Sequence, residues 1–362
     1  MIELAHVFRR YGPDYQTKYS EYMLPSHRRA IRAITSCRTE ALGGHVYRCD
    51  HCDEERYSYH SCRNRHCPKC QHDAAEDWLA RQQDFLLPTP YFLLTFTLPN
   101  CLREIARSNQ RAIYNLLFRA SAAATQELAQ DPRFVGGQIG MVGILHTWGR
   151  DLNYHPHVHY LIPGGGLDDG GQSWMPSKEE FLVHVKPLSI LFRAKFREAL
   201  KKTELFALVP AITWQQEWVV HCRPVGNGVA ALKYLAPYIF RVAISNKRIL
   251  KLADGKVTFR YTESGTGQPR ICTLAAEEFI RRFLQHVLPK GFVKVRYYGF
   301  FSSSSRHRLH QARQLLCAQA APEFEEPAQE TATNSEAADR CPQCGQIMRL
   351  VQTLKPYRQR PP

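Results

Sequence analysis

The sequence predicts an α+β protein in which a sheet flanked by helices follows a small zinc-binding domain. After residue 88, aromatic and β-branched runs of strand length alternate with longer helical patterns. Six of the twelve cysteines crowd into residues 37–70. The 362 residues, 44% hydrophobic and 22% charged, suit a globular protein with two or three cores.

The amino-terminal part divides into helices and a polar, cysteine-rich module. Residues 1–36 place apolar residues three and four apart with basic residues between them, which is typical of amphipathic helices. Residues 37–72 are polar and rich in cysteine, as expected of a zinc module. Residues 73–87 predict a helix that Asp73 could cap and that the following prolines end.

The next elements predict the sheet. YFLLTFTL at residues 91–98 indicates a buried strand, and residues 101–130 indicate a long helix. GMVGILHTW at 140–148 and HVHYLI at 157–162 predict two strands of a hairpin with a long loop. The glycine-rich residues 163–171 predict a further loop.

The rest of the chain continues the alternation. We expect helices at 178–206, from Asn227 through the string YLAPY, and at 277–288, with strands at 214–222, 256–262 and 292–301. The predicted parts are a helical and zinc-binding domain (1–87), a sheet domain (88–316), an acidic flexible linker (317–340) and a CxxC tail (341–362).

The charge is strongly positive and unevenly distributed. The whole chain carries +15, but residues 318–340 hold six acidic residues and one basic residue, so the rest carries about +20. An excess of this size favours a polyanion partner such as nucleic acid, because each neutralised phosphate releases condensed counterions.

The sequence shows no export or membrane signal. Its first residues, MIELAHVFRRYGP, contain no apolar stretch like that of a signal peptide, and the apolar run at 91–98 is too short for a bilayer. We therefore expect a cytoplasmic protein with no membrane partner. In such a protein, clustered cysteines bind metal rather than form disulfides.

Two CxxC pairs predict a structural zinc site. Cys49 and Cys52 are separated by fourteen residues from Cys67 and Cys70, and each pair can place two thiolates on a tight knuckle. Two such knuckles supply the four sulfur ligands of a tetrahedral Zn²⁺ site with bonds of about 2.3 Å.

Other cysteines leave the ligand set open. Cys37 and Cys62 could enter a mixed tetrad, build a second site or be buried free thiols. Cys341 and Cys344 could find partners in this chain or in another subunit, so a homo-oligomer also stays open. Two basic residues among the cysteines are candidate DNA contacts: Arg63 and Arg65.

A run of alternating histidines predicts a different metal site. In YHPHVHYLI, His157 and His159 flank Val158, so their side chains share one face of a strand, about 6.5–7 Å apart at the backbone. His146 on the preceding strand can lie opposite the pair and is the preferred third ligand, with His155 as the alternative. Three neutral imidazoles suit Mn²⁺ or Zn²⁺, and Mg²⁺ could act through its abundance. Such an ion can polarise a phosphate oxygen.

Two tyrosines are candidate nucleophiles. Tyr234 and Tyr238 would lie one turn apart on a helix. Alone, such a pair is more often core packing, but beside a histidine metal site it favours covalent catalysis. The surrounding basic residues are candidate contacts to a DNA backbone: Lys233, Arg241, Lys247 and Arg248.

Several longer strings resemble one known family. They are CRTEALGGHVYRC with SCRNRHCPKC, then HPHVHYLIPGGG, YLAPYIFRVAISNKRI and FLQHVLPKGFVKVRYYGF. These strings are similar to segments of the rolling-circle transposases of the insertion sequence 91 type, which belong to the HUH endonuclease superfamily. The resemblance covers nearly the whole chain.

The resemblance implies a fold, a site and a reaction. The fold would be a central antiparallel sheet with His157 and His159 on a middle strand, His146 as third ligand, and the helix of Tyr234 and Tyr238 packed beside it. A tyrosine would cleave single-stranded DNA at the element ends, leaving a 5′-phosphotyrosine and a free 3′-OH, and the strand would then be transferred. Mg²⁺ or Mn²⁺ would be the catalytic ion, and Zn²⁺ would be structural.

Two other functions fit part of the pattern. A zinc metallohydrolase could use three histidines to hold Zn²⁺ and activate water, but it needs neither the tyrosines nor the positive charge. A DNA-binding protein without catalysis would use only the zinc module and the basic helices.

Overall fold

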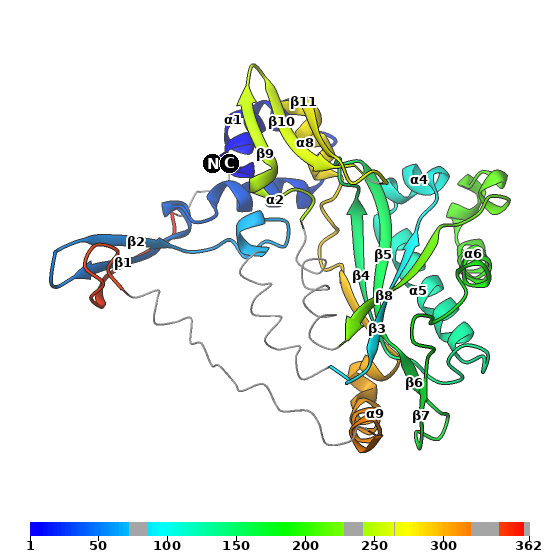
Figure 1. The fold of residues 1–362 in the computed structure, drawn as a ribbon. Coiled ribbons are helices and arrows are strands. Elements are labelled where there is room, and N and C mark those ends of the chain that lie inside the picture. The colour runs from blue at the N-terminus through cyan, green and yellow to red at the C-terminus, as the bar shows by residue number, and fades with distance from the viewer. Residues whose placement is uncertain (72–85, 228–241, 264, 320–339, 358–362) are drawn as a thin grey trace.

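The computed structural model describes residues 1–71, 86–227, 242–263, 265–319 and 340–357. Its centre is a five-stranded sheet in the order β12-β4-β5-β3-β8, with every neighbouring pair antiparallel (Figure 1). The strands are β3 (Pro90–Thr97), β4 (Met141–Trp148), β5 (Tyr154–Pro163), β8 (Val220–Asn227) and β12 (Val295–Tyr298). The expected α+β class and central antiparallel sheet are therefore confirmed.

Helices cover one face of this sheet. They are α4 (Arg103–Ser108), α5 (Gln110–Ala129) and α6 (Val185–Lys201), which lie on the same side of the strands (Figure 1). Phe96 and Val158 belong to the core between the layers, where the Phe96 ring meets that of Phe192 edge to face at 4.9 Å. Because side chains alternate along a strand, the neighbours of Val158 point to the opposite face.

A second lobe joins helices from both halves of the chain. α1 (Leu4–Lys18), α2 (Pro25–Ser36) and α8 (Ala276–Leu284) share a core with the sheet of β9 (Ile249–Ala253), β10 (Lys256–Thr262) and β11 (Pro269–Ala275). Phe8 of α1 meets Phe283 of α8 edge to face at 5.3 Å. The helices expected within residues 1–36 and the strand expected at 256–262 are confirmed, whereas the helix expected at 277–288 ends at Leu284.

The glycine-rich stretch at 163–171 is not simply a loop. It contains β6 (Gly165–Leu167), which pairs with β7 (Trp174–Pro176), and both strands pack against α9 (Arg306–Gln319). A Cβ on Gly165 would lie 2.6 Å from the Trp174 ring. The glycine there permits close packing against an aromatic ring, a use that composition does not distinguish from a loop.

Three other elements differ from the sequence prediction, one of them the strand expected at 292–301, which covers only Val295–Tyr298. The helix expected at 178–206 is shorter, because α6 covers only Val185–Lys201. The strand expected from residue 214 begins at Val220, after a 3-10 turn over Ala211–Trp214. The reason is a local hydrogen bond, since the indole Nε1–H of Trp218 donates to the carbonyl of Thr213 at 3.0 Å and folds the chain back.

The zinc module contains a three-stranded sheet built from both ends of the chain. Its order is β13-β1-β2, where β1 is Gly44–Cys49, β2 is Glu55–Tyr59 and β13 is Met348–Leu354. β13 pairs antiparallel with β1, from Gly44 opposite Leu354 to Cys49 opposite Met348. The segment that we expected to be a separate CxxC tail therefore joins the amino-terminal module.

Some predictions lie outside the described residues. These are nearly all of the helix at 73–87, the helix carrying the tyrosine pair, and nearly all of the acidic linker. Within the part of the chain that the structure describes, no helix combines the length and apolar character needed to cross a bilayer.

Candidate active site and metal centres

Three histidines meet on the face of the central sheet opposite the one that α4, α5 and α6 cover. His146 on β4 lies directly opposite His157 on β5, and His159 follows two residues later on the same face. The sheet order makes β5 the middle strand. One ligand nitrogen from each ring lies within 4.8 Å of the other two. The structure thus brings together the three histidines that the sequence singled out.

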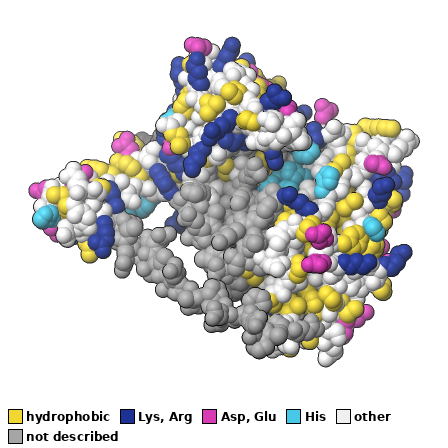
Figure 2. Space-filling model, viewed as in Figure 1, with side chains coloured by type: hydrophobic (Ala, Val, Ile, Leu, Met, Phe, Trp, Pro, Cys, Tyr) yellow, Lys and Arg dark blue, Asp and Glu magenta, His cyan; other side chains and the backbone are white. Residues whose placement is uncertain are grey.

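The three rings are packed closely, and two of them are buried while His157 is partly exposed. Their centroids lie 4.7 Å apart for His157 and His159, 5.0 Å for His146 and His159, and 5.4 Å for His146 and His157. His146 is 2% exposed and His159 is 8% exposed. Trp148 stacks on His146 at 4.8 Å and covers it from one side. Figure 2 shows histidine side chains gathered beside the upper lobe, next to Lys and Arg.

Hydrogen bonds fix which nitrogen can bind a metal. His157 Nδ1 lies 2.7 Å from the carbonyl oxygen of His155, and since a carbonyl only accepts, Nδ1 must carry the proton. In the neutral ring, Nε2 then carries the lone pair. His159 Nδ1 lies 2.9 Å from Thr95 Oγ1, which can accept in the same way. Metal-binding histidines are usually oriented by such a bond from the second nitrogen.

His155 has a different environment from the three. Its Nδ1 lies 2.5 Å from the Arg103 guanidinium, which can only donate. Burial, and then the Arg103 charge, lower the pKa of His155 from its usual value. Within the described residues the cluster comprises His146, His157 and His159. The preferred choice of third ligand therefore agrees with the geometry, and the alternative does not.

The sequence reasoning missed Thr95. It lies on β3 opposite His159 in the strand register. The two threonines of the mostly apolar string YFLLTFTL were the available signal, but the pairing partner of β3 was needed to show which of them meets a histidine nitrogen.

The predicted DNA contacts fall into three groups. Arg63 and Lys247 are exposed. Arg65 donates to the carbonyl of Pro289 at 2.8 Å, and Arg248 donates to the carbonyl of Arg260 at 2.9 Å. These bonds within the protein account for the positions of both side chains without DNA. The others lie outside the described residues, as do both candidate nucleophiles: Lys233, Arg241, Tyr234 and Tyr238.

The cysteines form two clusters of four, and neither is the predicted one. Cys67 and Cys70 lie with Cys37 and Cys62, whereas Cys49 and Cys52 lie with Cys341 and Cys344. The expected single site from Cys49, Cys52, Cys67 and Cys70 is therefore wrong. The physical reason is the pairing of β13 with β1, which brings the distant CxxC to Cys49 and Cys52.

The sulfur spacing fits structural zinc. Sγ–Sγ distances are 3.5 Å for Cys37 and Cys70 and 3.6 Å for Cys62 and Cys70. Zn–S bonds of about 2.3 Å place tetrahedral sulfurs about 3.8 Å apart. Hydrogen bonds from Cys62 and Cys67 lower the pKa of Cys37 to about 2, while the pKa of Cys62 and Cys67 is raised. Four sulfurs held this close together favour a bound cation, which would stabilise all of them as thiolates.

Comparisons with known proteins agree with this architecture. Residues 7–98 match a family described as a transposase zinc-binding domain, and residues 140–308 match one described as a putative transposase. The chain is 42% identical, over 87% of its length and 84% of the relative, to the putative transposase y4qJ of Sinorhizobium fredii. It is 30% identical, over 75% of its length and 70% of the relative, to the transposase for insertion sequence element IS801 of Pseudomonas savastanoi pv. phaseolicola.

The matches cover both the zinc module and the sheet that carries the three histidines. They extend over most of the chain and most of each relative. The chain therefore belongs to the insertion sequence 91 family of transposases.

Proposed function

We propose that this transposase cleaves single-stranded DNA through a tyrosine of the pair Tyr234 and Tyr238, and then transfers the strand in rolling-circle transposition. The observation that carries the proposal is the cluster of His146, His157 and His159 on the middle of the sheet. The net charge of +15 supports a DNA substrate.

The histidine cluster fits a divalent metal. The carbonyl of His155 and the hydroxyl of Thr95 orient His157 and His159, so that neutral rings can present Nε2. Mg²⁺ or Mn²⁺ bound there would polarise a phosphate oxygen and help to fix the scissile group. Trp148 stacks on His146 and limits the access of water from that side.

The tyrosine would act as the nucleophile. Its phenolic oxygen forms a bond to the scissile phosphorus as the bond to the 3′ oxygen breaks, giving a 5′-phosphotyrosine and a free 3′-OH. The phenolic proton is lost, and the leaving oxygen gains one. In the transfer step, a 3′-OH attacks the phosphotyrosine and releases the tyrosine. The role of Tyr234 and Tyr238 rests on the sequence, since both lie outside the described residues.

A denaturing-gel assay for a covalent protein–DNA adduct tests the proposal. Labelled single-stranded DNA from the ends of the element is incubated with protein and Mn²⁺ or Mg²⁺. We expect a metal-dependent adduct that is lost in His157→Ala and in at least one of Tyr234→Phe and Tyr238→Phe. The surface variant His310→Ala on α9 is the matched control and should keep the adduct.

The same assay separates the two other functions. Cleavage without an adduct, unaffected by either tyrosine substitution, would indicate a three-histidine zinc hydrolase that acts through water. DNA binding with neither cleavage nor adduct would indicate a binding protein without catalysis. Either result would contradict the tyrosine mechanism.

A further inference from the structure

We propose that Cys341 and Cys344 complete, with Cys49 and Cys52, a second zinc site that fastens the carboxyl-terminal segment to the amino-terminal module. The segment lies beyond residues 7–98, which match the zinc-binding family. The two halves of the site are almost three hundred residues apart in the chain, and β13 and β1 bring them together.

The two CxxC loops have the same backbone geometry. In the first, the N–H of Asp53 donates to the carbonyl of Cys49 at 2.9 Å, and the N–H of Cys49 donates to Glu54 at 3.0 Å. In the second, Gly345 donates to Cys341 at 2.9 Å, and Cys341 donates to Gln346 at 2.7 Å. The residue after each second cysteine is left-handed, with φ of 59° at Asp53 and 75° at Gly345.

This repetition identifies two equivalent metal knuckles facing one another. The four sulfurs are closely spaced, with 3.4 Å between Cys49 and Cys344, 3.5 Å between Cys52 and Cys341, and 3.6 Å between Cys52 and Cys344. All lie near the spacing of about 3.8 Å that a tetrahedral zinc–thiolate site requires.

Apolar packing cannot hold this sheet together by itself. The buried members of its local core are Cys49, Cys341 and Met348, and β13 buries only Met348 fully. Modules with so small a core usually need a metal or a disulfide. Two of the three buried residues of this cluster are proposed ligands, and the other apolar side chain that β1 buries is Val46, so the metal would be the main support of the β13–β1 pairing.

Metal analysis of the full-length protein, with hydrogen exchange on the same samples, tests this site. We expect two zinc ions per wild-type chain and one in Cys341→Ser/Cys344→Ser. In that variant, amides of residues 348–354 should lose protection while those of β3 and β5 keep it. Cys317→Ser, an exposed cysteine of α9, is the matched control and should keep both ions.

The zinc count decides the outcome. One zinc in the wild type, or two in the double variant, would overturn the second site. If residues 348–354 keep their protection in a variant that has lost one zinc, the proposal that the second site holds this segment to the amino-terminal module would be overturned.

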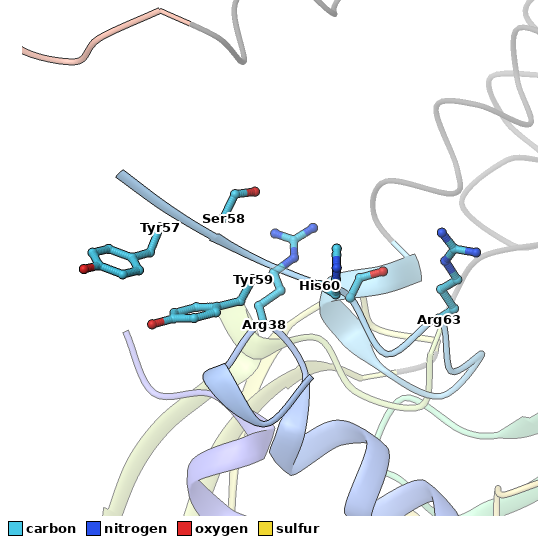
Figure 3. Close-up of a pocket in the computed structure, with 7 residues that line it drawn as sticks. Arg38, Tyr57, Ser58, Tyr59, His60 and Arg63 are labelled. Carbon is cyan, nitrogen blue, oxygen red and sulfur yellow. The ribbon is translucent and has the colours of Figure 1, made fainter. Parts of the chain in front are cut away.

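A separate observation carries a second inference, which rests on the proposed function. We infer that a cleft of about 700 Å³ beside the first cysteine cluster binds single-stranded DNA. Its lining contains two arginines, two tyrosines and a histidine, with two serines between them (Figure 3): Arg38, Tyr57, Ser58, Tyr59, His60, Ser61 and Arg63. None of these described lining residues is acidic, so the cleft complements a phosphate backbone.

The two arginines are positioned by the cysteine cluster itself. Arg38 follows Cys37, and Arg63 follows Cys62. Both arginines have left-handed backbones, with φ of 55° and 49°. Such conformations are costly for residues other than glycine, and they persist where the surroundings impose them. In Figure 3 both guanidinium groups point to the same side, with His60 between them in the view.

The two tyrosines supply a stacking surface. Tyr57 and Tyr59 point to the same face of β2, and their rings stack at 6.1 Å with 30° between the planes. Tyr57 is 54% exposed, and its hydroxyl donates to Glu55 Oε2 at 3.3 Å, so the ring is held in place with a face open to a base. Aromatic side chains beside basic ones are the usual means of binding unpaired bases.

Equilibrium binding of a fluorescent single-stranded oligonucleotide, with the full-length protein and no added catalytic metal, tests the cleft. Tyr57→Ala/Tyr59→Ala should weaken binding about 5- to 100-fold, and Tyr22→Ala, an exposed tyrosine elsewhere, should not. Arg63→Gly relieves the left-handed strain, so it should keep or raise the melting temperature while it weakens binding. In Arg63→Gly, the slope of the logarithm of the affinity against the logarithm of the salt concentration should become shallower by about 0.7.

The result is separable from the cleavage proposal, because binding needs no tyrosine chemistry. Unchanged affinity in the tyrosine and arginine variants, or an equal loss for a duplex, would overturn the cleft. A wild-type protein that forms no adduct, together with weakened binding in these variants, would overturn the cleavage proposal and leave the cleft supported.

Discussion

Thr95→Val tests whether the hydrogen bond to His159 prepares the histidine cluster for metal. Thr95 Oγ1 lies 2.9 Å from His159 Nδ1, and Thr95 stands opposite His159 in the antiparallel register. Valine has nearly the same shape and a high preference for strands, so β3 should be preserved. The change then removes one hydrogen bond and little else.

The expected effect is a loss of metal affinity. Removing a hydrogen-bond partner of a metal-binding histidine usually weakens binding about 10- to 100-fold, which corresponds to about 1.4–2.7 kcal/mol. The Nδ1 atoms of His157 and His159 have different partners, and only that of His159 is a side chain that substitution can remove. The other is the backbone carbonyl of His155.

Calorimetric titration with Mn²⁺ measures the affinity directly. Thr97→Val is a matched control, since Thr97 lies opposite His157, whose Nδ1 bonds to the backbone instead. Covalent adduct formation should recover in Thr95→Val at saturating Mn²⁺, because the ligands themselves remain. Equal Mn²⁺ affinity in Thr95→Val and wild type, in a protein where His159→Ala abolishes binding, would refute the reasoning.

Three further changes probe the fold. Gly143→Ala should lower the free energy of unfolding by about 1–3 kcal/mol, because its Cβ would lie 2.5 Å from the Tyr160 ring, whereas Gly170→Ala should be neutral in the same denaturation experiment. Burial lowers the pKa of His286 from 6.5 to about 4. The unfolded chain therefore binds more protons in this range, and stability should fall on the order of 3 kcal/mol as the pH drops from 6.5 to 4. His286→Gln should make stability depend less on pH in this range, and an unchanged dependence would contradict its attribution to His286. Zinc chelation should expose the amides of β1 and β2 to exchange while β3–β5 stay protected, and simultaneous loss of both would show a single folding unit.

The histidine cluster could be predicted because its information is local. Alternation along one strand places His157 and His159 on one face, and a hairpin places His146 opposite. The structure adds the strand on the other side of β5, which the sequence of the hairpin does not reveal. Thr95 reaches His159 only because β3, which precedes β4 in the chain, pairs with the far edge of β5.

The cysteine pairing could not be predicted for the opposite reason. Cys49 and Cys52 are nearer in sequence to Cys67 and Cys70 than to Cys341 and Cys344, so spacing alone favoured the wrong tetrad. The correct grouping depends on β13 joining β1. β13 is mostly exposed and has too weak an apolar pattern to be recognised as part of a core.

The two arginines of the string RNRHC have different roles, one at the cleft and one in packing, and composition alone does not distinguish them. Arg63 lines the cleft, whereas Arg65 donates to the carbonyl of Pro289 at 2.8 Å. His66 Nε2 accepts from the N–H of Leu288, and burial, as the largest cause, lowers its pKa to about 3 and keeps the ring neutral for that role.

These bonds join the zinc module to the segment that leads into β12, the strand beside β4. β4 carries His146, so the proposed DNA cleft and the histidine cluster are connected through a short series of direct contacts. In the proposed function, these contacts would hold the cleft and the histidine cluster in one arrangement while a single strand is bound.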